Sequence, residues 1–481
     1  MNYKNVEFWN AHPAVLIGIS FLIGIGTSLF SLPLWIFSCW LIYLLFMKKW
    51  AAICSLPAAA LYAWLLFGGL PQLEEPRAIN GYFTISNVKV NKTPFNQNYL
   101  YKGTLFLEKT PIPCTISVQK RPKASSDYQI TGTLIQRDKY DYLLKPKSWE
   151  KIPRTWSPAE WRFQAKEKLR HFLHTHLTLP RTATLLTSLA TGDVEDRLLR
   201  YEFSRLGLQH ILAISGFHFG VLIAFLALLL RFLPHRVQWL SMILLTTTYF
   251  LFIGDSPAVQ RAWIIVTLFL IAKLIKRPTT PINLLGTSLL IEVIYNPLVV
   301  ANLGFQFSFG SCFGILLLYR PIDEVLRSFL PARPAKESSR FPLIPGIAYI
   351  ICRTFRSGLS LTAAVNITLL PLLFLHFGKF PLLSLLYNLF FPFLISLALF
   401  TLLAALLCSL ASASLSKPIF SLLDSFTAHL LDLVSYPPLL LDYSIYFQNI
   451  PIQLIPLYLF ALLQISIYLK ARNEVISLFL R

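Results

Sequence analysis

The sequence predicts a polytopic α-helical membrane protein with a small β-barrel (OB-like) extracytoplasmic domain. Three observations lead to this fold class. First, 55% of the 481 residues are hydrophobic and only 14% are charged, whereas about 25% of a soluble domain is charged. Second, several windows stay apolar for the length of a bilayer crossing. Third, residues 71–154 are polar and partly alternate with period two.

The formal net charge of +20 has two uses in such a protein. Lys and Arg residues in cytoplasmic loops fix the topology, and the rest would attract anionic lipid or a polyanion. Composition does not separate these uses. The six cysteines are scattered without a CxxC motif, and most lie in or beside apolar segments, which is typical of small buried thiols.

Residues 1–70 are predicted to hold N-terminal transmembrane helices, from apolar segments at about 13–30, 33–47 and 51–69. Only Lys4 precedes the first segment, Glu7 offsets it, and no clear A-x-A cleavage site follows, so we interpret this segment as a retained helix. Lys48 and Lys49 make the second loop cytoplasmic. The third helix then leads the chain to the outer side.

Residues 71–154 contain about five short stretches with strand character, which suits an OB-like barrel. Basic residues outnumber acidic ones here and aromatic residues are interleaved, as on barrel faces that hold single-stranded nucleic acid. The candidates for binding nucleic acid are Tyr82, Phe83, Tyr99, Tyr101 and Lys102. The alternative is that the aromatic residues fill the barrel and the lysines only solvate it.

Residues 155–177 are predicted to form a basic amphipathic helix. Ser157 is its expected cap, Pro158 suits the first turn, and Glu160 completes a capping box. Apolar residues recur at helical spacing and basic residues take most of the other face, which favours a position in the membrane interface. A helix packed against the barrel is the alternative.

Residues 178–481 are predicted to be the transmembrane core, with spans that begin near residues 209, 238, 259, 281, 303, 343, 361, 380, 396, 420 and 452. Basic clusters recur every two spans and mark cytoplasmic loops; the last of them extends from Arg320 through Arg340. Arg353 and Arg356 fit this count poorly, because it places them outside. The segment near residue 343 is therefore the least secure span.

The stretch "LQHILAISGFHFGVL" contains the polar candidates His210, Ser215 and His218, with Gly216 and Gly220. Eight residues separate the two histidines, which gives no shared helix face, and a metal site needs three or four ligands. The G-x-S-x-G pattern of a serine hydrolase is absent. We interpret the stretch as a helix broken at Ser215 and Gly216, whose polar groups face protein or water. A tight glycine packing contact is the alternative.

Three further polar clusters occur in the core. Asp255 or Ser256 would cap a helix that starts at Pro257 and carries Arg261 on its second turn, an arrangement that can contact phosphate. The second cluster, residues 296–316, contains the candidates Gln306 and Ser308. The third, residues 366–394, contains His376 and Asn388. Each alone would suit contacts between helices, but four clusters in one bundle favour a polar pathway.

These segments resemble the ComEC-type competence proteins. "HILAISGFHFG" is similar to the family's "HLLAISGLHVG", "GDSPAVQRA" to "GxSxxxxRA", and "NPLVVANLGFQFSF" to "DP…GFQLSF"; Asn388 and Pro392 also match the segment that closes the family's core. Two phenylalanines, Phe217 and Phe219, replace aliphatic residues. Many relatives end in a metallo-β-lactamase-like domain, and we expect this chain to be a form without it.

The resemblance implies a channel that passes single-stranded DNA across the bacterial cytoplasmic membrane during transformation. The expected partners are single-stranded DNA, membrane lipid, a separate DNA receptor, a nuclease and a cytoplasmic ATPase, since no Walker A motif occurs. The sequence leaves open whether the protein forms a homo-oligomer. We expect no enzymatic activity, cofactor or metal. A membrane-embedded hydrolase and a small-solute transporter are the alternatives.

Overall fold

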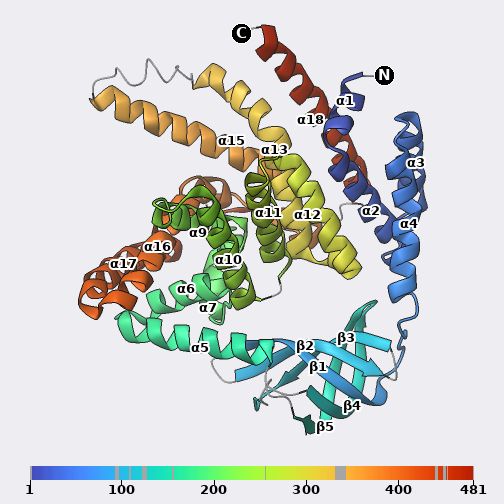
Figure 1. The fold of residues 1–481 in the computed structure, drawn as a ribbon, viewed down its shortest axis with the longest axis vertical. Helices are drawn as coiled ribbons and strands as arrows, with labels where there is room; N and C mark the ends of the chain where they lie inside the picture. Colours follow the sequence, from blue (N-terminus) through green and yellow to red (C-terminus); the bar gives the residue numbers. More distant parts are fainter. Residues whose placement is uncertain are drawn as a thin grey trace.

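The computed structural model describes residues 3–92, 97–107, 110–121, 127–153, 157–254, 256–330, 343–438, 442–447, 451 and 453–479. It is mostly helical, with one β domain at one end and both chain termini at the other (Figure 1). Asp255, residues 154–156 and most of the last basic cluster lie outside the described residues, so predictions for them are not tested.

Five helices are long and apolar enough to cross a membrane. They are α4 (Trp50–Phe67), α10 (His235–Ile253), α11 (Pro257–Leu274), α15 (Leu343–Phe377) and α16 (Leu383–Ala411). A sixth span is formed if α1 (Tyr3–Ala11) and α2 (Pro13–Leu29), which meet at 94°, are counted as one. The chain is thus a multi-pass membrane protein by the length and composition of its helices.

Several further helices complete the bundle. Shorter apolar helical segments are α3 (Leu34–Phe46), α9 (Gly216–Leu229), α12 (Pro281–Tyr295) and the part of the last helix, α18 (Leu454–Phe479), over Leu454–Leu469. The remaining ones are η1 (Pro297–Ala301), α13 (Leu303–Phe329) and α17 (Ala413–Ser435). Two short strands, β6 (Lys379–Pro381) and β7 (Ser444–Tyr446), pair antiparallel and tie two connections together.

Two of the helices had each been predicted as two separate spans, and this prediction was wrong. Residues 343–377 form one helix where spans were expected to begin at 343 and again at 361, and α16 replaces the two expected at 380 and 396. This resolves the position of Arg356. Its Nη1 donates to the Leu330 carbonyl at 2.8 Å and its Nε donates to Asp323 Oδ1 at 2.9 Å, so it lies at the end where α13 and α15 connect.

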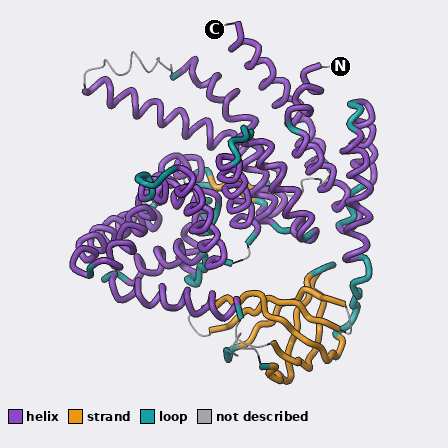
Figure 2. Tube along the Cα trace, in the orientation of Figure 1, coloured by secondary structure: helices purple, strands orange, loops and turns teal. Residues whose placement is uncertain are grey.

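The β domain has the five predicted strands: β1 (Arg77–Lys92), β2 (Gln97–Leu107), β3 (Thr110–Val118), β4 (Asp127–Asp138) and β5 (Asp141–Ile152). They pair in the order β1-β2-β3-β5-β4, and β4 pairs again with β1, so the sheet closes on itself. The seam between β3 and β5 is parallel and joins only three residue pairs. Figure 2 shows this sheet apart from the helical bundle.

Alternation along the strands sends one residue inward and the next outward. Phe83 and Tyr101 are fully buried in the core of the sheet, and Tyr99 is half-buried against that core. The prediction that Phe83 and Tyr101 belong to a DNA-binding face was therefore wrong for this structure. Tyr82 and Lys102 belong to the opposite set of the alternation.

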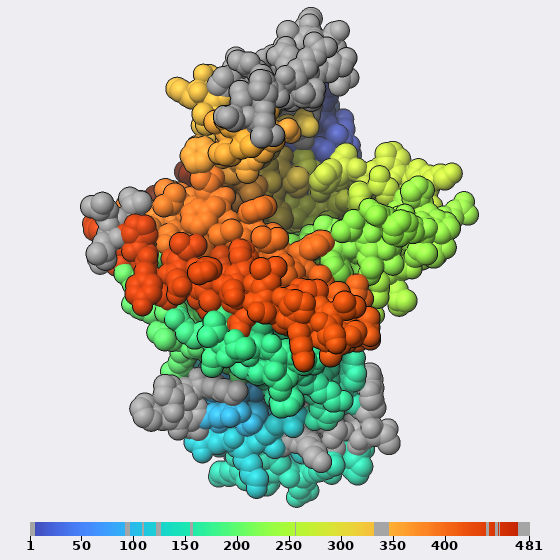
Figure 3. All heavy atoms as spheres, turned by 90° about the vertical axis from the view of Figure 1, so that its left-hand side faces the viewer, coloured from blue at the N-terminus to red at the C-terminus, as the bar shows by residue number. Residues whose placement is uncertain are grey.

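Helix α5 (Pro158–His176) joins the β domain to the helical core. Ser157 caps it by accepting from the Glu160 N–H at 3.5 Å. Ala159 packs into the core of the sheet, whereas Leu173 packs into the helical core with α6 (Pro180–Thr191) and α7 (Arg197–Arg205). In Figure 3 the red-orange α17 lies beside the green α5–α6 layer, with the β domain beyond it.

Three basic side chains of α5 contact protein. Lys166 is buried and bonds Asp193 at 2.9 Å, Arg170 pairs with Glu195, and Arg162 donates to the Ser86 carbonyl. Helix α5 therefore follows the alternative arrangement, packed against the β domain and the core. Contact of its remaining surface with lipid stays a prediction.

Candidate functional site

The predicted helix break is confirmed. A short helix, α8 (Gln209–Leu212), ends before Ala213, and α9 begins at Gly216 with extended backbone at Ser215. The Ser215 N–H donates to Nδ1 of His218 at 3.3 Å, so the imidazole satisfies one of the backbone donors at the start of the helix. His218 is only 3% exposed, and its Nε2 has no hydrogen-bond partner in the described structure.

His210 and His218 have separate surroundings. Nδ1 of His210 lies 3.2 Å from the Gly207 carbonyl, and the residue is exposed rather than buried. Among the described residues, no group of three or more His, Cys, Asp or Glu side chains could hold a metal ion.

Arg261 is the centre of the candidate site. It lies on α11, is 4% exposed, and its Nη1 donates to the Ser308 carbonyl and contacts Cys312 Sγ at 2.6 Å, both on α13. Its guanidinium carbon also lies 5.7 Å from the centre of the Phe309 ring. Because the guanidinium is directed into protein, it is held as a contact between helices and is not open to a phosphate in this structure.

Gly216 approaches the same guanidinium from a third helix. A Cβ at Gly216 would lie 3.0 Å from Nη2 of Arg261. The break before α9, the arginine of α11 and the polar turn of α13 therefore meet at one point, which we call the Arg261 junction (Gly216, Arg261, Ser308 and Cys312). Three of the four polar segments found in the sequence contribute to it.

Cys312 is the member that the sequence did not reveal. The residue was interpreted as an ordinary buried thiol, while Gln306 and Ser308 were preferred as polar groups. A helical repeat would have pointed to it, because Cys312 follows Ser308 by four residues and so lies on the same face of α13.

Gln306 connects the junction's helix to the fourth segment. Its Nε2 donates to the Val300 carbonyl at 3.0 Å, and its Oε1 lies 3.3 Å from Nε2 of His376 on α15. Asn388 lies on α16, and its Oδ1 is buried without a hydrogen-bond partner in the described structure. Ser256 is the N-cap residue of α11, but its side chain makes no capping hydrogen bond.

Gly220 lies apart from the junction. It borders an apolar groove of about 490 Å³ between α9 and α16, and a Cβ there would meet nothing within 4 Å. The groove is lined by Phe217, Gly220, Val221, Ala224, Phe393, Ser396, Leu397 and Phe400. The structure thus brings Gly216, Arg261 and Ser308 together in a buried polar junction and places Gly220 at an apolar groove. The other predicted candidates belong to neither.

Comparison with known proteins agrees with this arrangement of segments. The family model for the competence protein matches residues 191–472, more than half of the chain, and this region contains the whole Arg261 junction. The chain belongs to the competence protein family. The β domain and α5 precede the matched region.

Two relatives of this competence protein are similar over shorter regions. ComE operon protein 3 of Bacillus subtilis (strain 168) is 29% identical over 178 residues, which cover 36% of this chain and 23% of that protein. An uncharacterized protein, the MG316 homolog of Mycoplasma pneumoniae, is 29% identical over 136 residues, covering 26% of this chain and 34% of that protein. The chain therefore spans well under two thirds of either relative. No solved structure matches it significantly.

Proposed function

We propose that this competence protein is a channel that passes single-stranded DNA across the bacterial cytoplasmic membrane during DNA uptake. Family membership supports a role in DNA uptake. The observation that carries the proposal further is the Arg261 junction, where a broken helix, a buried arginine and a polar helix turn meet within the bundle. Irregular backbone at membrane depth is tolerated where it is buried in protein or lines a cavity.

The positive-inside rule gives the proposed orientation. Lys48 and Lys49 in the loop before α4 favour a cytoplasmic position for that loop. Helix α4 then leads directly toward the β domain, which would place this domain outside. The N- and C-termini lie at the opposite end of the molecule (Figure 1).

The β domain would receive the strand as an OB-like barrel. Its closed strand order supports this description. Tyr82 is near Phe106 on the neighbouring strand, with ring centres 5.9 Å apart, and Phe106 is 37% exposed. Lys102 is also exposed and lies further along β2. Bases stack on exposed aromatic rings and lysines attract the backbone, so the proposed face is Tyr82, Phe106 and Lys102.

The remaining partners are part of the same proposal. A separate DNA receptor would deliver the strand, a nuclease would produce it, and a cytoplasmic ATPase or the membrane potential would drive its movement. Lipid would surround the apolar helices.

Gene deletion in a competent host tests the proposed function. Labelled DNA is supplied, external DNA is digested, and the protected label in the cytoplasm is measured. The proposal expects loss of the cytoplasmic label with DNA still bound at the cell surface, restored by the intact gene. Unchanged entry of label after deletion would refute it.

A further inference from the structure

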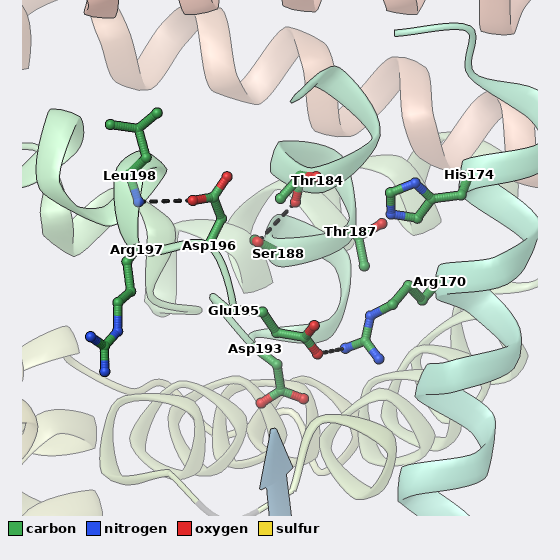
Figure 4. Close-up of a pocket in the computed structure, with 10 residues that line it drawn as sticks. All are labelled: Arg170, His174, Thr184, Thr187, Ser188, Asp193, Glu195, Asp196, Arg197 and Leu198. Carbon is green, nitrogen blue, oxygen red and sulfur yellow. Dashed lines mark hydrogen bonds and ion pairs between the residues drawn. The ribbon is translucent and has the colours of Figure 1, made fainter. Parts of the chain in front are cut away.

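A second polar site lies outside the Arg261 junction. It is a pocket of about 370 Å³ between the C-terminal half of α5, helix α6 and the start of α7. Figure 4 shows its residues: Arg170, His174, Thr184, Thr187, Ser188, Asp193, Glu195, Asp196, Arg197 and Leu198. Its volume is in the range of small-ligand sites. The pocket thus lies where the C-terminal half of α5 meets the helical core, and the N-terminal half of the same helix packs on the β domain.

Thr187 provides the first evidence for a ligand. Helix α6 carries five hydroxyl residues, and four of them donate to a carbonyl three or four residues earlier: Thr182, Thr184, Ser188 and Thr191. Thr187 does not. It is 4% exposed, and its Oγ1 has no hydrogen-bond partner in the described structure. A buried hydroxyl normally finds a partner, and because Thr187 lines the pocket we interpret its hydroxyl as a partner for a bound molecule.

Each acidic residue of the pocket already has a partner. Asp193 pairs with Lys166 at 2.9 Å, and Glu195 pairs with Arg170 (Figure 4). Asp196 Oδ1 accepts from the Leu198 N–H at 2.8 Å, which leaves its other oxygen as an acceptor. The interior therefore offers carboxylate and hydroxyl oxygens without a large net charge, and this suits a neutral group that donates hydrogen bonds.

Arg197 adds a cation at the edge of the pocket. Its side chain is exposed, and no ion pair within the described ranges engages it. An exposed guanidinium next to a pocket of acceptors matches a ligand with an anionic end and a neutral hydrogen-bonding end. A nucleotide has both, since the amino group of cytosine or adenine donates to carboxylate and hydroxyl oxygens.

We propose that this pocket binds one nucleotide of the entering strand, with an amino-bearing base toward Thr187 and Asp196 and its phosphate near Arg197. The inference rests on the proposed transport of single-stranded DNA, in which the pocket would hold one nucleotide of the strand where α5 meets the helical core.

Binding of dCMP to the full-length protein in nanodiscs tests the pocket directly, with ligand-observed NMR and titration as the readout. Thr187→Val removes the hydroxyl at nearly constant shape, and we expect about fivefold weaker dCMP binding, the typical effect of one neutral hydrogen bond. Arg197→Gln should also weaken binding. Thr191→Val is the matched control, because Thr191 is buried on the same helix and does not line the pocket. Binding of dTMP, which lacks the amino group, should be weaker than that of dCMP.

Three results would overturn the inference, and a fourth would overturn only the proposed function. Equal dCMP affinity in the Thr187 and Thr191 variants would place the nucleotide elsewhere, and equal affinity for dCMP and dTMP would exclude recognition of the amino group. If dCMP does not bind while (dC)12 does and DNA uptake is normal, the pocket fails but the proposed function stands. If uptake is independent of the gene and dCMP still binds through Thr187, the proposed function fails alone.

Discussion

Nη2 of Arg261 lies 3.0 Å from the place that a Cβ of Gly216 would occupy. The guanidinium cannot move away freely, because its Nη1 is held by the Ser308 carbonyl and contacts Cys312 Sγ. Gly216 therefore allows a close approach between α9 and the arginine of α11 that a larger residue would crowd.

We expect Gly216→Ala to lower the Tm of the purified protein and to reduce DNA uptake, because the methyl group displaces the Arg261 guanidinium. The Gly220→Ala variant is the control for the Tm measurement and is not used for DNA uptake. It lies on the same helix with open space beside it, and alanine improves helix propensity by up to about 1 kcal/mol. A Gly216 variant as stable as the Gly220 variant would contradict the close approach.

Gly254→Ala should destabilise the protein by about 1–3 kcal/mol, since φ +91° and ψ −177° belong to a region that is accessible essentially only to glycine. A Cβ there would also lie 3.2 Å from Nε of Arg162, whose Nη2 donates to the Ser86 carbonyl in the β domain. Differential scanning fluorimetry would measure the loss. Hydrogen exchange should also increase in β1 near Ser86, and unchanged exchange there would argue against a link between α10 and the β domain.

Asp323→Asn should cost about 3–5 kcal/mol of stability, because it leaves the Arg356 guanidinium, 5% exposed, without its anionic partner. Glu324→Gln is the matched control, since Glu324 is the next residue and is exposed. Thermal unfolding in detergent compares the two. Equal Tm values would mean that this ion pair does not hold α13 to α15.

Burial lowers the pKa of the Lys166 ammonium below its usual 10.5, although Asp193 opposes the shift. Between the lowered and the usual pKa, the unfolded chain binds more protons than the folded chain, so the free energy of unfolding rises with pH across that window. We expect Lys166→Met to remove this part of the rise in a Tm profile taken toward pH 10.5. Lys168 is exposed, so Lys168→Met should keep the wild-type rise of Tm with pH. Loss of this rise in both variants would contradict its assignment to Lys166.

The helices and strands were largely predictable because their signals are local. Apolar length identified α4, α10 and α11, and period two identified all five strands. The same period would have separated Tyr82 from Phe83, since neighbours on a strand face opposite sides; grouping them as one DNA-binding face ignored the alternation. Helices α15 and α16 were each divided, because apolar length alone does not show whether a helix continues through a polar residue or a proline.

The Arg261 junction could be predicted only in part. Gly216, Arg261 and Ser308 were recognisable as polar or helix-weakening residues in apolar surroundings, but their contact depends on how three helices pack. Cys312 and the free hydroxyl of Thr187 were missed for the same reason. The spacing of Cys312 from Ser308 shows only that they share a face of α13. The contact of Cys312 with Arg261, like the unpaired hydroxyl of Thr187, depends on the neighbours that tertiary packing supplies.

Entry of labelled DNA into the cytoplasm of cells that carry Arg261→Gln tests the central claim most directly. Glutamine removes the guanidinium that joins α9, α11 and α13. Arg236→Gln is the control, because Arg236 is exposed on the first turn of α10. With equal amounts of both variants in the membrane, the account predicts that cytoplasmic label is lost in the Arg261 variant and kept in the Arg236 variant, with surface binding of DNA unchanged. Normal entry of label in the Arg261 variant would contradict it.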